Sequence, residues 1–155
     1  MNINWKRWII ASTYRKLASY TRTGVPLGNI DVPIIFPGTD QSDKNIKYWL
    51  EVSIQNVSFN EQMKGCWKYE HSINIMIFVA NEVKYLYAKD YLQGLVAAMF
   101  KDYDANTYGN QVGDTDEWLC CLNLMGEINI RELGMSQDKF HVTVVSGFFE
   151  TTLEE

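Results

Sequence analysis

Histidine, the side chain most often used for proton transfer near neutral pH, occurs only twice, as His71 and His141. Both lie in the middle of apolar, strand-like stretches, where packing inside a sheet or an interface is commoner than action as a general base. No nucleophile-elbow motif accompanies them, and the phosphate-binding patterns GxxxxGK and GxGxxG are absent from the sequence. The sequence therefore predicts no catalytic residues, and we expect a protein that is not an enzyme.

The strongest metal-binding pattern is an acidic stretch that follows residue 101. Asp102, Asp104 and Asn106 alternate like the first ligands of a calcium-binding EF-hand loop. Such a loop needs glycine at its sixth position and a bidentate glutamate at its twelfth, where this sequence has Thr107 and Gly113. We therefore expect no metal and no cofactor. A solvated acidic loop is the simpler interpretation, and a calcium site is the alternative.

Five tryptophans raise the question of base stacking by a single-strand binding protein. That function needs basic residues interleaved with the rings, and only residues 5–8 and 67–68 offer them. Packing in a core or at an interface explains the tryptophans more simply.

The net charge of −5 hides a marked asymmetry along the chain. Residues 1–30 carry five basic and no acidic side chains, whereas the remainder carries nine basic and nineteen acidic ones. An acidic chain is a poor candidate for wrapping nucleic acid. The basic residues near Arg15 and Lys16 either meet an acidic surface of a neighbouring copy or form a solvated helix face.

Composition and length predict one folded domain over residues 1–155, because 46% of the residues are hydrophobic and 21% are charged. No apolar run reaches the ~20 residues of a membrane span, and the first residues do not form a signal peptide. Cys66, Cys120 and Cys121 form an odd set without metal-binding spacing, which favours reduced thiols. We expect a protein assembled in the cytoplasm, without contact to a membrane.

Residues 48–79 predict two long strands joined near Lys64 and Gly65. Apolar and polar residues alternate along both strands, as is typical of a strand with one buried face. The residues expected on the buried face are Tyr48, Leu50, Val52, Ile54, Tyr69, His71, Ile73, Ile75, Ile77 and Val79. Both strands exceed the usual length of about five or six residues, so we expect the hairpin to protrude from the domain.

The other elements follow from the same periodicities. Helical spacing predicts helices over residues 5–20 and 82–100, the second capped by Asn81, with a stripe consisting of Tyr85, Ala88, Leu92, Leu95 and Met99. Because of its prolines, the short strand at 32–38 should be an edge strand or one protected by bulges. We expect a loop at 101–115, strands at 118–130 and 140–149, and a turn at 133–136 between them. The last strand should be central, or covered on both sides, because both its faces are apolar. The fold class is α+β: an antiparallel-rich sheet with a long protruding hairpin and two helices packed against it.

The far end of this hairpin is the predicted interaction site, because an unpaired ribbon carries a risk of aggregation unless a partner covers it. We expect contacts with another subunit or another protein there and on the basic first helix. The residues proposed for these contacts are Phe59, Glu61, Met63, Lys64, Trp67, Lys68, Arg15 and Lys16.

The order of these elements resembles the tail terminator (tail completion) proteins of long-tailed bacteriophages. The sequence VPIIFP at residues 32–37 is followed by YWLEVSI at 48–54, and then by the hairpin, a helix and two closing strands. In that family a VPI-aromatic-P segment precedes a W-hydrophobic-x-V segment in the same order. The resemblance covers nearly the whole chain but depends on pattern and order alone.

The resemblance implies a structural virion protein at the tail-head junction. Members form a hexameric ring that caps the tail tube, ends its polymerisation and meets the head connector or head-closure protein. DNA would pass through the lumen without specific binding, which a negative lumen favours. The alternatives are another neck or tail ring component, such as a head-closure or tail-tube protein, and a small ligand-binding domain or enzyme.

Overall fold

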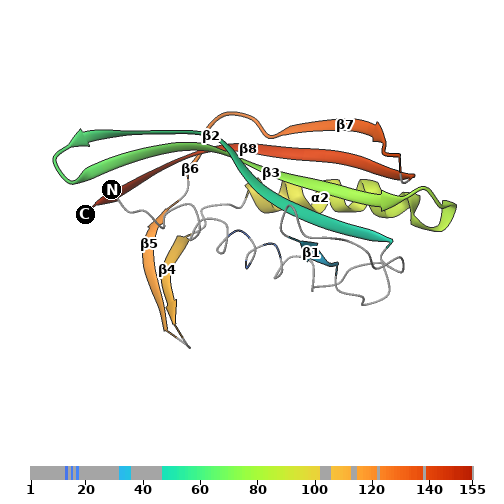
Figure 1. The fold of residues 1–155 in the computed structure, drawn as a ribbon, viewed down its shortest axis with the longest axis horizontal. Helices are drawn as coiled ribbons and strands as arrows, with labels where there is room; N and C mark the ends of the chain where they lie inside the picture. Colours follow the sequence, from blue (N-terminus) through green and yellow to red (C-terminus); the bar gives the residue numbers. More distant parts are fainter. Residues whose placement is uncertain are drawn as a thin grey trace.

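A computed structural model describes residues 13, 15, 17, 32–35, 47–101, 106–112, 115–121, 123–137 and 139–154. Their centre is a six-stranded sheet in the order β1-β2-β3-β8-β6, with β7 pairing with β8 as well (Figure 1). Strand β1 (Ile34–Ile35) runs parallel to β2, and every other strand pair described in the sheet is antiparallel. This confirms an α+β fold with an antiparallel-rich sheet and confirms that the proline-bounded strand is an edge strand.

The long hairpin consists of β2 (Tyr48–Met63) and β3 (Cys66–Ala80), with Lys64 and Gly65 in the turn between them. All ten residues that the alternation predicts to be buried are buried. In β3 the alternate residues from Tyr69 to Val79 have no exposed surface. Full burial of each isoleucine in that row stabilises the fold by about 1.5–3 kcal/mol, so this face is the main contribution of the hairpin to the core.

Strand β8 (Phe140–Glu154) is central, as its two apolar faces predict, and continues past the expected end at residue 149. It pairs with β3 over the whole length of β3, from Ala80 opposite Phe140 to Cys66 opposite Glu154, without a register shift. Its other edge pairs with β7 (Asn129–Met135) and then with β6 (Asn123–Leu124).

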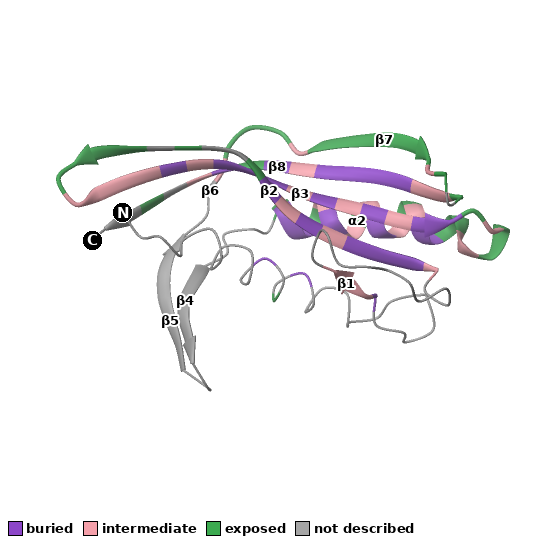
Figure 2. Ribbon diagram, viewed as in Figure 1, coloured by how far each residue is buried: buried purple, intermediate pink, exposed green. Residues whose placement is uncertain are grey.

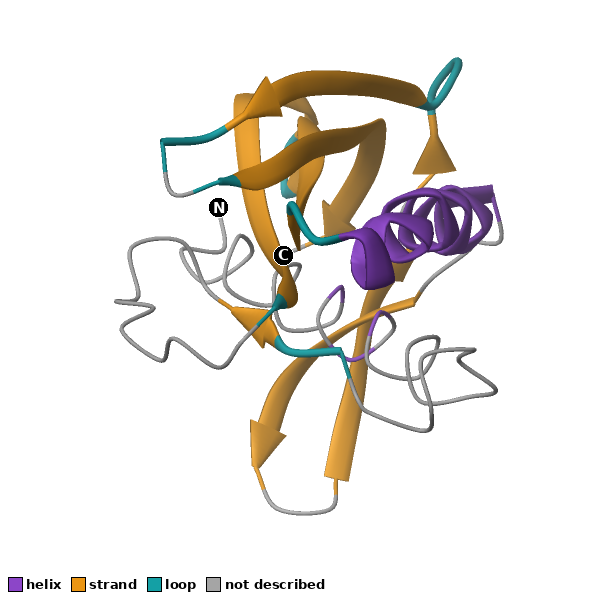
Figure 3. Cartoon of the chain, turned by 90° about the vertical axis from the view of Figure 1, so that its right-hand side faces the viewer, coloured by secondary structure: helices purple, strands orange, loops and turns teal. Residues whose placement is uncertain are grey.

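The helix begins with the 3-10 turn η1 (Val83–Tyr85) and continues as α2 (Leu86–Lys101), close to the predicted bounds. Figure 3 shows α2 lying against one face of the sheet, and Figure 2 shows the burial where the two meet. The buried residues of α2 are Ala88, Leu92, Val96, Met99 and Phe100. The predicted stripe is correct for Ala88, Leu92 and Met99, whereas Tyr85 and Leu95 are half-buried at its margin.

The predicted cap at Asn81 is wrong. Glu82 occupies the N-cap position and makes no side-chain cap hydrogen bond. The Asn81 side chain instead pairs with His141, at 2.9 Å between Oδ1 and Nε2. The Asn81 side chain thus bonds to a residue far away in the sequence instead of to the backbone N–H groups of the helix, which is the local bond that a capping pattern predicts.

The predictions for residues 101–136 need correction. The expected loop contains β4 (Asn106–Val112), which pairs with β5 (Thr115–Cys121) in a separate two-stranded sheet. The expected strand at 118–130 is divided among β5, β6 and β7, and the chain turns between β6 and β7 at Gly126, where φ is +79°. The expected turn at 133–136 is too early: β7 continues to Met135, with a register shift next to Gly134, and the connection to β8 lies at residues 136–139.

The predicted first helix lies outside the described residues except at three positions. Thr13, Arg15 and Leu17 are helical. Thr13 and Leu17, four residues apart, are buried, whereas Arg15 between them is exposed. Leu17 joins the same core as the hairpin and α2.

Two glycines give opposite expectations for stability. A Cβ added at Gly147 in β8 would lie 2.7 Å from a ring carbon of Phe149, whereas one added at the exposed Gly94 in α2 would meet nothing within 4 Å. We expect Gly147→Ala to lower the free energy of unfolding by about 1–3 kcal/mol because the buried ring must move. Gly94→Ala should raise it by about 0.5–1 kcal/mol through helix propensity. Urea denaturation of both variants tests this, and equal effects would contradict the packing of Phe149 over Gly147.

Candidate functional site

The tip of the hairpin is the end of a three-stranded ribbon. Near the tip, β3 pairs with β2 on one side, where Asn60 lies opposite Lys68. On its other side β3 pairs with β8, where Cys66 lies opposite Glu154. The expectation of a bare two-stranded ribbon is therefore wrong, because β8 reaches as far as the turn. A third strand gives the tip more support than a two-stranded hairpin has on its own.

The turn itself is closed by a carboxylate. Glu61 Oε1 accepts a hydrogen bond from the backbone N–H of Gly65 at 3.0 Å, and Gly65 has φ of 80°. Met63, next to this turn, has 70% of its surface exposed, and Lys64 is exposed as well. Glu61 therefore stabilises the turn. Of the residues predicted to bind a partner, Met63 and Lys64 are exposed to solvent here.

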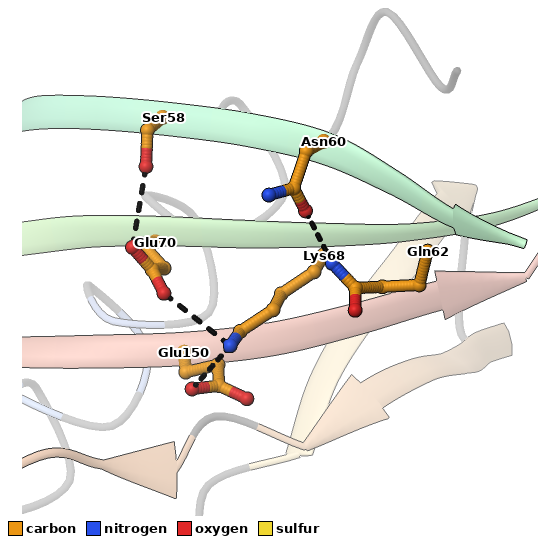
Figure 4. A network of polar contacts seen from close by, with 6 residues as sticks. All are labelled: Ser58, Asn60, Gln62, Lys68, Glu70 and Glu150. Carbon is orange, nitrogen blue, oxygen red and sulfur yellow. Dashed lines mark hydrogen bonds and ion pairs between the residues drawn. The ribbon is translucent and has the colours of Figure 1, made fainter.

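One face of the ribbon carries a polar network that joins all three strands (Figure 4). The Lys68 ammonium lies 3.2 Å from a carboxylate oxygen of Glu150 in β8 and 3.4 Å from one of Glu70 in β3. Ser58 in β2 donates to the other oxygen of Glu70 at 3.4 Å. Hydrogen bonds to Glu150 and then Glu70 raise the pKa of Lys68. Lys68, which was predicted to bind a partner, thus forms ion pairs with Glu70 and Glu150 within the ribbon.

The opposite face of the ribbon is apolar and continues into the core. Tyr69 and His71 are fully buried, and Trp67 is half-buried and packs against the core residues. Trp67 therefore anchors the ribbon more than it displays a contact surface. Phe59 pairs with Tyr69 through its backbone position. Of the two basic residues predicted to bind, Arg15 is exposed and Lys16 lies outside the described residues.

The two histidines have different surroundings. His71 is buried, with its ring 6.2 Å from that of Phe149, and burial lowers the pKa of His71 to about 4. His141 is half-buried near the start of β8 and pairs with Asn81, so the apolar surroundings expected for it are wrong. His71 is thus a neutral core residue at neutral pH.

The candidate calcium loop falls on residues 102–104, outside the described residues, and Asn106 begins β4. Among the residues that the structure describes, no group of three or more histidine, cysteine, aspartate or glutamate side chains could hold a metal ion. Cys66 is a free cysteine. Within the same part of the chain, no helix has the length and apolarity needed to cross a membrane.

The edge strand β7 is a second exposed surface, which the sequence pattern did not predict. All seven residues of β7 are exposed, including Ile130, Leu133 and Met135. Ile130 was expected at the end of the strand at 118–130, and the other two in the turn at 133–136. The available signal was Gly126 followed by alternating residues from 128 onward, which indicates a new strand but not its exposure.

No family model and no curated protein matches the chain. Among solved structures, 17 chains match it. One of them, whose name gives no function, has a TM-score of 0.51 and 11% sequence identity over 94% of each chain. At this identity the similarity supports the fold alone, over nearly the whole length of both chains.

Burial of His71 predicts a pH dependence of stability. Between its ordinary pKa of about 6.5 and its folded pKa of about 4, the unfolded chain binds a proton that the folded chain does not. Stability present above pH 6.5 is therefore lost as the pH falls towards 4, by up to about 3 kcal/mol.

Urea denaturation between pH 7 and pH 4 measures this loss in the wild type and in His71→Leu, which should lose less. Tyr69→Phe, a change at the neighbouring buried position in the row, serves as the control and should keep the wild-type dependence. A His71→Leu curve parallel to that of the wild type would contradict the assignment.

Proposed function

We propose that the chain is a structural virion protein of a long-tailed bacteriophage that forms a ring, of six copies by resemblance, at the tail-head junction. There it would cap the tail tube, end tube polymerisation and join the tail to the head connector or head-closure protein. The observation that carries this proposal is the exposed tip of the β2–β3 hairpin, which β8 supports as a third strand. The resemblance in element order, at residues 32–54 and in the hairpin, helix and closing strands, supports the choice of this family.

The shape of the hairpin suits a contact arm. From Ser58 to Lys64, every residue whose burial is described is exposed, while the strands at the other end of the sheet are packed against α2. We infer that the tip protrudes from the domain and that two helices pack against the sheet. A hairpin tip that a third strand holds in place loses little conformational entropy when it binds, which favours an assembly contact with a neighbouring copy or the tube.

Charge gives a second, weaker argument. The chain has a net charge of −5, which would let DNA pass through a ring without sticking to it. The basic segment that includes Arg15 and Lys16 would then meet the acidic surface of a neighbour. Arg15 lies at an exposed helical position, as that contact requires.

Native mass spectrometry and negative-stain images of the purified protein, alone and with cognate tail tubes, test this function. We expect an open ring alone or on the tube end. Filaments of the protein alone would favour a tail-tube protein instead. A single-chain species that tail tubes do not recruit would contradict the proposal.

The contribution of the tip is tested by Met63→Lys, because a lysine in place of the exposed methionine disfavours apolar contact without entering the core. We expect at least a tenfold loss of binding to tail tubes or of ring formation, with an unchanged melting temperature. Val83→Lys, at an apolar residue that is 88% exposed at the start of η1, is the matched control and should assemble normally. Equal assembly of both variants would show that the tip is not a contact surface.

A further inference from the structure

The sheet has a second candidate surface in the outer edge of β7. Five of the nine large apolar residues that the described chain exposes lie between residues 125 and 148, so the exposed apolar surface is concentrated on this side of the sheet. Three of them are in β7 itself: Ile130 is 46% exposed, Leu133 50% and Met135 52%. An edge strand with apolar side chains and unpaired backbone groups is a template for another strand.

The charges of β7 limit what can pair with it. Glu132 Oε1 lies 3.0 Å from the Lys89 ammonium, which lowers the pKa of Glu132 and neutralises its charge locally. Arg131 is exposed and makes no ion pair with a described residue. The edge therefore presents one uncompensated positive charge, which favours an acidic strand as its partner.

The opposite edge of the same sheet meets that requirement. Strand β1 pairs with β2 only at Leu50 and Glu51, so β2 from Ser53 to Met63 has no described strand on its outer side. Glu61 is the one charged residue between Ser53 and Met63, and it makes no ion pair within the described part of the chain. The open stretch of β2 thus carries a negative charge where the β7 edge carries a positive one.

The two open edges also lie on the same side of the molecule. Figure 1 shows β2 along the upper border of the sheet in the half that contains the tip, and β7 along the upper border in the other half. The sheet twists between the two halves, which brings opposite edges of the strand order to one side. A second copy can therefore approach this side with a complementary edge.

We propose that the outer edge of β7 in one copy pairs with the open outer edge of β2, residues 53–62, in a second copy. Main-chain hydrogen bonds join the two sheets, as in strand addition to a sheet edge. Arg131 then lies against the acidic β2 edge, and the partner strand covers part of Ile130 and Leu133. The contact joins two different surfaces, so it can build a ring as well as a closed pair. The inference deepens the proposed function, on which it depends only for the number of copies.

The test uses variants of the full chain that block one edge each. Ile130→Lys/Leu133→Lys places two lysines on β7, and Gln55→Lys/Asn60→Lys places two on the β2 edge, because charged residues at an edge prevent strand addition. Val83→Lys/Tyr87→Lys makes the same charge change at exposed apolar residues near the start of α2. Circular dichroism checks the fold, and light scattering measures native mass over a range of concentrations.

We expect the wild type and the Val83→Lys/Tyr87→Lys control to exceed the mass of one chain, 18.0 kDa, and each edge variant to fall to it. An equimolar mixture of the two edge variants should recover a species of two chains, because each supplies the edge that the other lacks. Arg131→Glu, a single exposed change, tests the same contact if a double variant misfolds, and it should raise the dissociation constant for self-association at least tenfold.

Three results would overturn the inference: a wild type that keeps the mass of one chain at its highest soluble concentration, edge variants that keep the wild-type mass, or a mixture that does not associate. The same data separate this inference from the proposed function. A pair of copies that never forms a ring and never binds tail tubes would support the edge contact and contradict the tail function. Rings that survive both edge blocks would support the function and overturn the edge contact.

Discussion

The uninterrupted pairing of β3 with β8 is the constraint on which the rest of the structure depends. Fifteen residues of β3 pair with fifteen of β8 without a bulge, while β3 also pairs with β2 along its other edge. A strand that is hydrogen-bonded on both edges keeps its alternation fixed, because a slip of one residue would move every buried side chain to the other face. The buried row from Tyr69 to Val79 is the consequence, and α2 covers its apolar part.

The same pairing divides the molecule into two ends with different properties. At one end, Ile75 and Ile77 face α2, and the other face of the sheet carries an aromatic cluster in which Trp49 stacks on Phe78 at 4.6 Å. At the other end, the strands continue to the tip, where a polar network around Lys68 replaces apolar packing on one face. Phe149 lies between the two ends, with its ring 5.6 Å from that of Phe100 in α2. A core built mainly at one end leaves the other end available for contacts with other molecules.

The two surfaces considered for assembly differ in how the fold exposes them. The tip is exposed because the strands are long, a property that the sequence of residues 48–79 carries directly. The β7 edge is exposed because β7 is the last strand on its side of the described sheet, and nothing in its own seven residues requires that position. The first is a local property and the second is a property of the strand order.

Elements whose periodicity reflects burial could be predicted from the residues alone. Alternation predicted the buried faces of β2 and β3, helical spacing predicted α2 to within a few residues, and apolar residues on both faces predicted that β8 is central. Only the tertiary structure decided that β8 supports the tip, that Lys68 is engaged by Glu150, that Gly126 ends one strand before another begins, and that Ile130 and Leu133 are exposed. The physical reason is that residue type records whether a side chain can be buried, whereas the strand order decides which neighbour buries it.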